Sequence, residues 1–219
     1  MRPSDGGWTV AVLLAGTWVL VLSGCSTAID TSRRNLVSVG AGWGRLNADS
    51  PPPADIEIED SERKLDFANA FAFDGTYARR LTGPRAPLGL FVEGVVQWVP
   101  PSRVEGPDAE RSCEVGWLLA GGGLRIQSPS VDGFSVSADG GYGLLRASQS
   151  GCSGNAAPPG SAGAATVGSP FAGFTLEFGL GPKMAWSIGI RVTRVPLDRL
   201  GLGERRWAGA GSVRILIAF

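Results

Sequence analysis

The residue types that most often carry catalysis or bind metals are sparse in this chain of 219 residues. Histidine is absent, which excludes His-dependent catalytic triads, dyads and zinc sites. Serine, carboxylate and arginine side chains are present, but no spacing among them points to a nucleophile with its base. We therefore expect no catalytic residue, no metal site and no organic cofactor.

Six charged residues stand apart among apolar and small neighbours. They are Asp74, Glu93, Asp139, Glu177, Arg191 and Arg214. A charge in such surroundings is costly when it is buried without a partner. If the fold brings the six together, we expect one hydrogen-bonded network, with Glu177 and Arg191 near one another across a hairpin. The competing hypothesis makes the same groups a buried active site.

The densest charge in the chain is acidic and lies between Asp49 and Glu62. No spacing in this stretch resembles a calcium loop, so we expect a solvated loop. The alternatives are a loop that gathers divalent cations near lipopolysaccharide phosphates and a loop that presents a binding surface. Over the whole chain 20 basic residues balance 20 acidic ones, and this zero net charge gives no general attraction to nucleic acid.

Eight segments alternate between apolar and small or polar side chains, which is typical of β-strands. The predicted strands are Leu36–Leu46, Leu65–Arg80, Leu88–Val99, Cys113–Ile126, Phe134–Arg146, Phe171–Gly181, Ala185–Val195 and Trp207–Phe219. Their connections alternate strictly between long and short, as they do in transmembrane β-barrels. We therefore predict an all-β fold, an eight-stranded antiparallel up-and-down transmembrane β-barrel.

The two faces of the predicted strands favour a membrane environment over water. In the last strand one face carries large apolar side chains, whereas the other is mostly alanine and serine with Arg214 as its one charge. Small residues suit the crowded interior of an eight-stranded barrel, and the alternation points all six isolated charges inward. Such an interior has room only for packed side chains, so we expect a barrel that conducts nothing.

Aromatic residues gather towards both ends of the predicted strands. Those expected near the long loops are Trp43, Trp98, Trp117, Tyr142 and Trp207, and those near the short turns are Tyr77, Phe134, Trp186 and Phe219. Two such girdles are typical of barrels whose amphipathic rings meet lipid headgroups. In the fourth strand, the run Gly121-Gly122-Gly123 is a candidate for a bulge that switches the faces.

The chain ends with apolar residues at alternate positions, Val213, Ile215, Ile217 and Phe219. This ending resembles the C-terminal assembly signal of outer-membrane barrels, which implies recognition by the outer-membrane assembly machinery. With its strand count and loop order, the chain from Leu36 onward resembles the small eight-stranded barrels of the OmpA and OmpX type. The resemblance implies a monomer in the bacterial outer membrane, in contact with lipid and lipopolysaccharide, and it implies no activity.

The N-terminus has the features of an export signal. The uncharged run from Trp8 to Leu22 is short for a bilayer-spanning helix but suits a secretory signal. Leu22-Ser23-Gly24-Cys25 resembles the lipobox of bacterial lipoproteins, which implies lipidation at Cys25; ordinary cleavage after Ala28 is the alternative. We expect a lipoprotein-type signal peptide at residues 1–24, a periplasmic linker at 25–35 and the barrel at 36–219.

Export would bring the two remaining cysteines into an oxidising compartment, where disulfides persist. Cys113 begins one predicted strand beside a long loop, and Cys152 lies in the next long loop on the same side of the barrel. We therefore predict a disulfide between Cys113 and Cys152. Two free buried thiols are the alternative.

These features favour a structural or surface-interaction role through the long loops. Two alternatives are an outer-membrane barrel enzyme acting on membrane lipid and a lipid-anchored, lipocalin-like binding protein. The lipocalin alternative fits poorly at Trp43, because Ala41 occupies the position at which the Gly-x-Trp motif of that family has glycine.

Overall fold

The computed structural model describes residues 34–46, 66–67, 70–84, 86–105, 112–150, 163–200 and 206–219. The strands are β1 (Asn35–Leu46), β2 (Asp66–Phe67), β3 (Ala70–Arg80), β4 (Gly89–Glu105), β5 (Ser112–Gln127), β6 (Phe134–Ser150), β7 (Ala164–Gly179), β8 (Met184–Val195) and β9 (Arg206–Ala218). A four-residue 3-10 helix, η3 (Leu197–Leu200), follows β8. Within the described residues no helix has the length and apolar character needed to cross a membrane.

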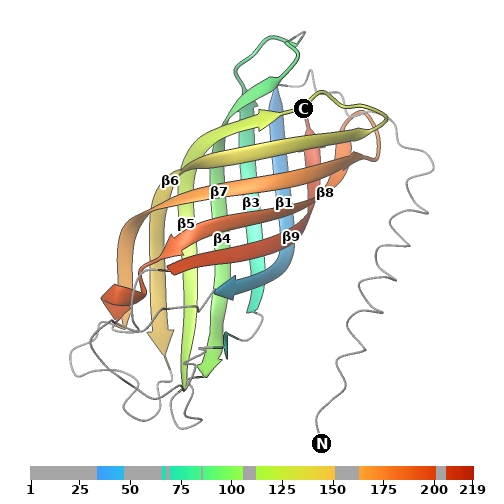
Figure 1. Cartoon of the computed structure of the whole chain (residues 1–219). Helices are drawn as coiled ribbons and strands as arrows, with labels where there is room; N and C mark the ends of the chain where they lie inside the picture. Colours follow the sequence, from blue (N-terminus) through green and yellow to red (C-terminus); the bar gives the residue numbers. More distant parts are fainter. Residues whose placement is uncertain are drawn as a thin grey trace, which may run out of the picture.

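The strands form a closed antiparallel barrel. They pair in the order β2-β4-β3-β1-β9-β8-β7-β6-β5, and pairing between β4 and β5 closes the sheet. β2 continues β3, because both pair with β4 in one register. The barrel is therefore eight-stranded and up-and-down, with tilted strands and its short turns gathered at one end (Figure 1). This confirms the predicted fold class.

Several strands extend further towards the long connections than the sequence predicts. β4 continues to Glu105 instead of Val99, and β7 begins at Ala164 instead of Phe171. The added residues are mostly small or polar and carry little strand signal of their own. They are ordered by pairing with a neighbour, as where Ser148 of β6 pairs with Ala164. Cross-strand pairing therefore outweighs weak local propensity.

The glycine run of β5 does not hold a bulge, contrary to the possibility raised by the sequence. β5 pairs continuously with β4 and β6 through Gly121–Gly123. The register shift lies in β4 between Val99 and Ser102. Pro101 occupies this bulge and has no N–H to donate to the ladder. A β-carbon on Gly116 of β5 would lie 2.6 Å from the Pro101 nitrogen, so only glycine fits opposite the bulge.

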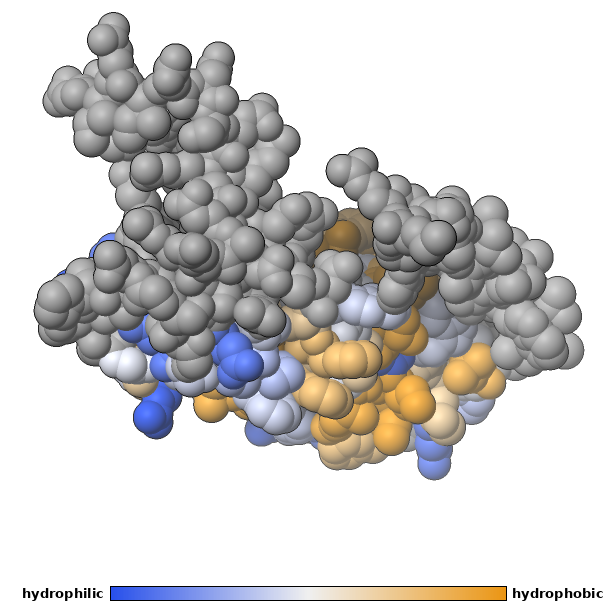
Figure 2. Space-filling model, turned by 90° about the horizontal axis from the view of Figure 1, so that it is seen from below, coloured by the Kyte–Doolittle hydropathy of each residue, from blue (hydrophilic) through white to orange (hydrophobic). Residues whose placement is uncertain are grey.

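The outward face of the barrel is apolar. Its exposed side chains include Val39, Phe73, Val96, Ile190 and Val213, which come from five different strands. Figure 2 shows part of this surface as a hydrophobic patch with hydrophilic residues beside it. The apolar residues of the period-two pattern thus lie on the outer wall, as predicted.

Most of the predicted aromatic girdle residues point outward. Trp43, Trp98, Tyr142 and Trp207 are exposed near the long connections, and Tyr77, Phe134 and Phe219 are exposed near the short turns. Trp186 is half-buried and stacks on Phe178 with ring centroids 4.2 Å apart. The prediction for Trp117 is wrong: this side chain is buried inside the barrel. It shares the inward face of β5 with Leu119 and Arg125, because the alternation of β5 is unbroken.

Candidate functional site

The interior of the barrel is packed in three layers, and the middle one is charged. This charged layer consists of Asp74, Glu93, Arg125, Asp139, Glu177, Arg191 and Arg214. An apolar cluster fills the interior towards the long connections, and a smaller one, including Phe91 and Leu216, fills it towards the short turns. The interior is thus closed by apolar packing on both sides of a layer of buried ion pairs.

Arg191 of β8 is the centre of the charged layer. Its guanidinium donates to the carboxylates of Asp74 at 3.2 Å, Glu93 at 3.2 Å and Asp139 at 3.3 Å. These acids belong to β3, β4 and β6, and β4 lies opposite β8 in the barrel. The guanidinium carbon also lies 5.8 Å from the centre of the Phe171 ring. A single buried cation therefore connects opposite walls of the barrel.

Arg125 of β5 joins the remaining carboxylate to this centre. It pairs with Glu177 of β7, and its Nη1 lies 3.6 Å from Glu93 Oε2. Glu177 is fully buried and accepts further hydrogen bonds from Gln127, Ser135 and Ser137. The buried carboxylate is therefore surrounded by donors, as a desolvated charge requires.

Arg214 of β9 completes the layer. Its Nε lies 2.6 Å from Asp74 Oδ2 and donates to Ser212 Oγ at 2.8 Å. Its Nη1 donates to Thr175 Oγ1 at 3.2 Å. Because Asp74 also accepts from Arg191, the two arginines share one carboxylate.

Glycines make room for two of these ion pairs. Gly173 lies between Asp139 of β6 and Arg191 of β8, and Gly40 lies between Asp74 of β3 and Arg214 of β9. In both cases the acid and the arginine meet over an intervening strand. A β-carbon on Gly173 would lie 2.5 Å from Asp139 Oδ1 and would displace the carboxylate. Glycine at these two positions therefore leaves the space that the ion pairs occupy.

The six charges singled out from the sequence all lie in this layer, but one expected pairing is wrong. The register of the β7–β8 hairpin places Glu177 opposite Ser187 and Arg191 opposite Gly173. Four residues of ladder thus separate Glu177 from Arg191, and no ion pair joins them among the described residues. Alternation in the sequence identifies the face of the strand on which a residue lies. The residue's ion-pair partner depends on the register between strands, which alternation does not give.

Sequence reasoning missed two members of the site, Arg125 and Gln127. The glycine run Gly121–Gly123 left the faces of β5 undecided, and so Arg125 was not assigned to the interior. An unbroken alternation that starts from Leu119 places both residues on the inward face. The signal was present in the sequence, and the possibility of a bulge obscured it.

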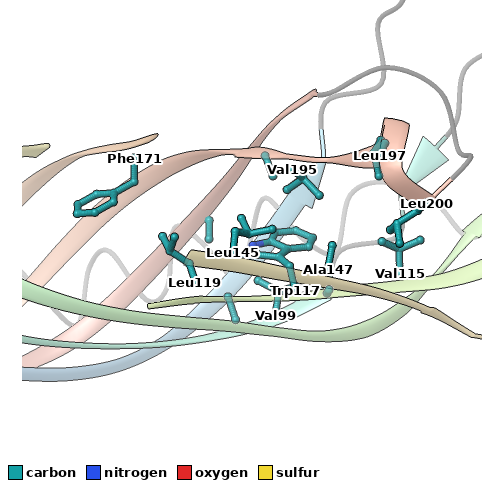
Figure 3. Packing of buried hydrophobic residues seen from close by; sticks show 14 of the residues in the cluster. Val99, Val115, Trp117, Leu119, Leu145, Ala147, Phe171, Val195, Leu197 and Leu200 are labelled. Atoms are coloured by element: carbon teal, nitrogen blue, oxygen red, sulfur yellow. The ribbon is translucent and has the colours of Figure 1, made fainter. Parts of the chain in front are cut away.

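The interior near the long connections is closed by η3, which the sequence places in a loop. Its Leu197 and Leu200 are fully buried in the apolar cluster that also contains Val115, Trp117 and Ala147 (Figure 3). These leucines lie three residues apart, so one turn of 3-10 helix directs both to the same side. η3 therefore covers this end of the interior with apolar side chains.

The proposed assembly residues occupy the outward face of β9. Val213, Ile215, Ile217 and Phe219 are all about half exposed on this face. Phe219 and Asn35 exchange two backbone hydrogen bonds of 3.0 Å, so the last residue pairs with the start of β1. The C-terminal residues therefore take part in the seam that joins the first and last strands.

The structure leaves the predictions for the cysteines and the N-terminus untested. Cys113 lies in β5 opposite Val104, but its side chain, Cys25 and Cys152 are outside what the structure describes. Residues 1–33 and the acidic segment 49–62 are also outside the described residues. Among the residues that are described, no group of three histidine, cysteine or acidic side chains is placed to hold a metal.

The fold is similar to those of two bacterial surface proteins of known structure. Ail, the attachment invasion locus protein of Yersinia pestis, matches with a TM-score of 0.51 and 14% identity over 86% of this chain and 100% of Ail. Neisserial surface protein A matches with a TM-score of 0.54 and 13% identity over 84% of this chain and 97% of that protein. No protein-family model and no curated protein sequence matches the chain. At these identities the likeness shows the fold alone.

Proposed function

We propose that this chain is an integral outer-membrane β-barrel with a structural or surface-interaction role, and that it conducts nothing. The observation that carries the proposal is the polarity of the barrel, which is the reverse of that of a water-soluble barrel. Phe71 on the outer wall is 67% exposed, whereas Arg191 in the interior is 1% exposed. A water-soluble barrel exposes charges and buries large apolar side chains, whereas a barrel in lipid faces its solvent with apolar ones.

The arrangement of the connections supports an orientation in the membrane. If the exported N-terminus enters from the periplasm, β1 crosses outward and every long connection lies outside the cell. Contacts with other molecules would then be made by the long connections. One structure of Ail contains the heparin analogue sucrose octasulfate. In this chain the acidic segment 49–62 would repel such a polyanion, so we assign no sulfated ligand.

The N-terminal features support export, and we propose lipidation at Cys25 as part of it. The monomeric state and assembly by the outer-membrane machinery belong to the same proposal. We give the chain no enzymatic role, because it contains no histidine and its buried charges pair with one another.

Cell fractionation followed by gel electrophoresis with and without boiling tests the proposal. The protein is expected in the outer-membrane fraction and should migrate at different positions before and after heating, because folded barrels resist SDS in the cold. A single unchanged band in the soluble fraction would contradict the outer-membrane barrel.

Substitution of Phe219 is expected to impair assembly. Phe219→Asp places a charge at the membrane interface and on the strand that pairs with β1, so the folded, heat-modifiable fraction should fall by at least about threefold. Phe219→Leu and the inward-facing Ala218→Ser serve as controls and should assemble normally. Equal assembly of Phe219→Asp and the controls would argue against a terminal assembly signal.

The predicted disulfide between Cys113 and Cys152 is expected to protect both thiols. Alkylation of the unfolded, unreduced protein should label neither residue, and labelling should appear after reduction. The bond would stabilise the barrel by up to about 4 kcal/mol if it is unstrained. Ready labelling of either cysteine without reduction would exclude the bond.

A further inference from the structure

A pocket of about 90 Å³ opens in the outer wall near the long connections, where β4, β5 and β6 lie side by side. The side chains that matter here are Trp98 and Pro101 of β4, Leu118 of β5, and Arg146 and Ser148 of β6. Its volume is about three times the share of one water molecule in the liquid, about 30 Å³. It lies outside the charged layer, and its inner side reaches Val99 and Trp117 of the apolar cluster.

The bulge of β4 creates this pocket. Between Val99 and Ser102 the β4–β5 ladder is interrupted, and Pro101 lies directly against the backbone of Gly116. Just beyond the bulge the ladders align Trp98, Leu118 and Arg146 in one outward-facing row across three strands. Trp98 is held in place by stacking on Phe73, with ring centroids 5.6 Å apart. The wall of the pocket is therefore preformed.

The polar side of the pocket is cationic, because Arg146 and Ser148 form it. Arg146 is exposed on the outer wall, and no carboxylate pairs with it among the described residues. Ser148 adds a hydroxyl two residues further along the same face of β6. A guanidinium with a neighbouring hydroxyl matches the geometry and charge of a phosphate group.

The apolar side of the pocket continues down the outer wall. Below the row of Trp98 and Arg146, β5 presents the small Ala120 between the larger Val96 and Leu144. An acyl chain can lie against Ala120 between these larger side chains. A ligand with a phosphate at one end and hydrocarbon at the other therefore fits both parts.

The level of the pocket in the membrane also agrees with a ligand of this kind. Trp98 belongs to the outward aromatic residues near the long connections, a level at which rings meet lipid headgroups. We propose that the pocket binds a phosphate of lipid A, the lipid of the outer leaflet, and this rests on the orientation given above. Phospholipids occupy the opposite leaflet, at the end of the short turns.

A second arginine provides a matched control. Arg194 of β8 is also exposed on the outer wall and pairs in register with Trp207 of β9, another exposed girdle tryptophan. It therefore has the same charge and a similar aromatic neighbour, but it does not line this pocket. A general attraction of lipid phosphates to surface arginines would involve both residues equally, whereas a built site involves Arg146 alone.

The experiment titrates the purified full chain in zwitterionic detergent with diphosphorylated lipid A and counts bound lipid by native mass spectrometry. We expect one tightly bound molecule per barrel, binding weaker by at least about tenfold for Arg146→Gln, and unchanged binding for Arg194→Gln. Dephosphorylated lipid A and phosphatidylglycerol should also bind at least about tenfold more weakly than diphosphorylated lipid A.

Three results would overturn the proposal: unchanged binding by Arg146→Gln, equal losses for the two arginine variants, or equal affinity for phosphatidylglycerol. The heat-dependent gel shift of each variant shows independently that the barrel is folded. Failure of the lipid site therefore differs from failure of the outer-membrane barrel itself, which would abolish the shift in the unsubstituted protein.

Discussion

Replacing Arg191 with methionine is expected to destabilise the barrel by about 3–5 kcal/mol, the cost of removing one partner from a buried ion pair. Asp74, Glu93 and Asp139 would each lose a charge-assisted hydrogen bond from its guanidinium. Methionine fills much of the volume but supplies no donor, so three carboxylates would lie close together in the interior with less compensation. The expected fall in Tm is on the order of 10 °C.

The matched control for this change is Arg194→Met, three residues along the same strand. Arg194 is exposed on the outer wall and has no carboxylate partner among the described residues, so its removal should shift Tm by no more than about 2 °C. Thermal unfolding in detergent, followed by circular dichroism, measures both variants. Equal Tm values for Arg191→Met and the unsubstituted protein would contradict the structural role of the charged layer.

Replacing Glu177 with glutamine is expected to cost about 3 kcal/mol, although the two side chains have nearly the same shape. Arg125 would lose the closer of its two carboxylate partners, and the new amide group would direct a donor towards Gln127 or Ser135, which are donors already. Glu114→Gln is the control, because Glu114 is exposed and accepts a hydrogen bond from Ser150 Oγ at 3.3 Å. Urea unfolding in detergent compares the two variants. A stable Glu177→Gln barrel that had lost an enzymatic activity would favour the buried active site instead.

The architecture of the barrel could be predicted from the sequence because period-two alternation is a local property. Residues such as Val213 and Arg214 show by their order alone which face of β9 each one occupies. The same alternation, together with the order of the loops, gave the eight strands and the inward direction of the charges. The alternation, the strand count and the loop order together predict a closed eight-stranded barrel, and none of them requires knowledge of a contact between side chains.

The pairing inside the barrel could not be predicted, because it depends on register and on contacts across the interior. Arg191 meets Glu93 from the opposite wall, which no local pattern encodes. The same holds for η3, whose Leu197 is buried only because Trp117 and its neighbours present an apolar surface to it. The shift at Pro101 likewise depends on how Gly116 on the next strand accommodates it.

Single-channel recording in planar lipid bilayers tests most directly the claim that this barrel is sealed by its own side chains. The charged layer and the two apolar clusters fill the interior with packed side chains, so the purified, heat-modifiable protein is expected to insert without producing discrete currents. A large-pore outer-membrane porin, recorded in the same bilayers, shows that insertion is detectable. Stable, stepwise currents from this protein would contradict the sealed interior.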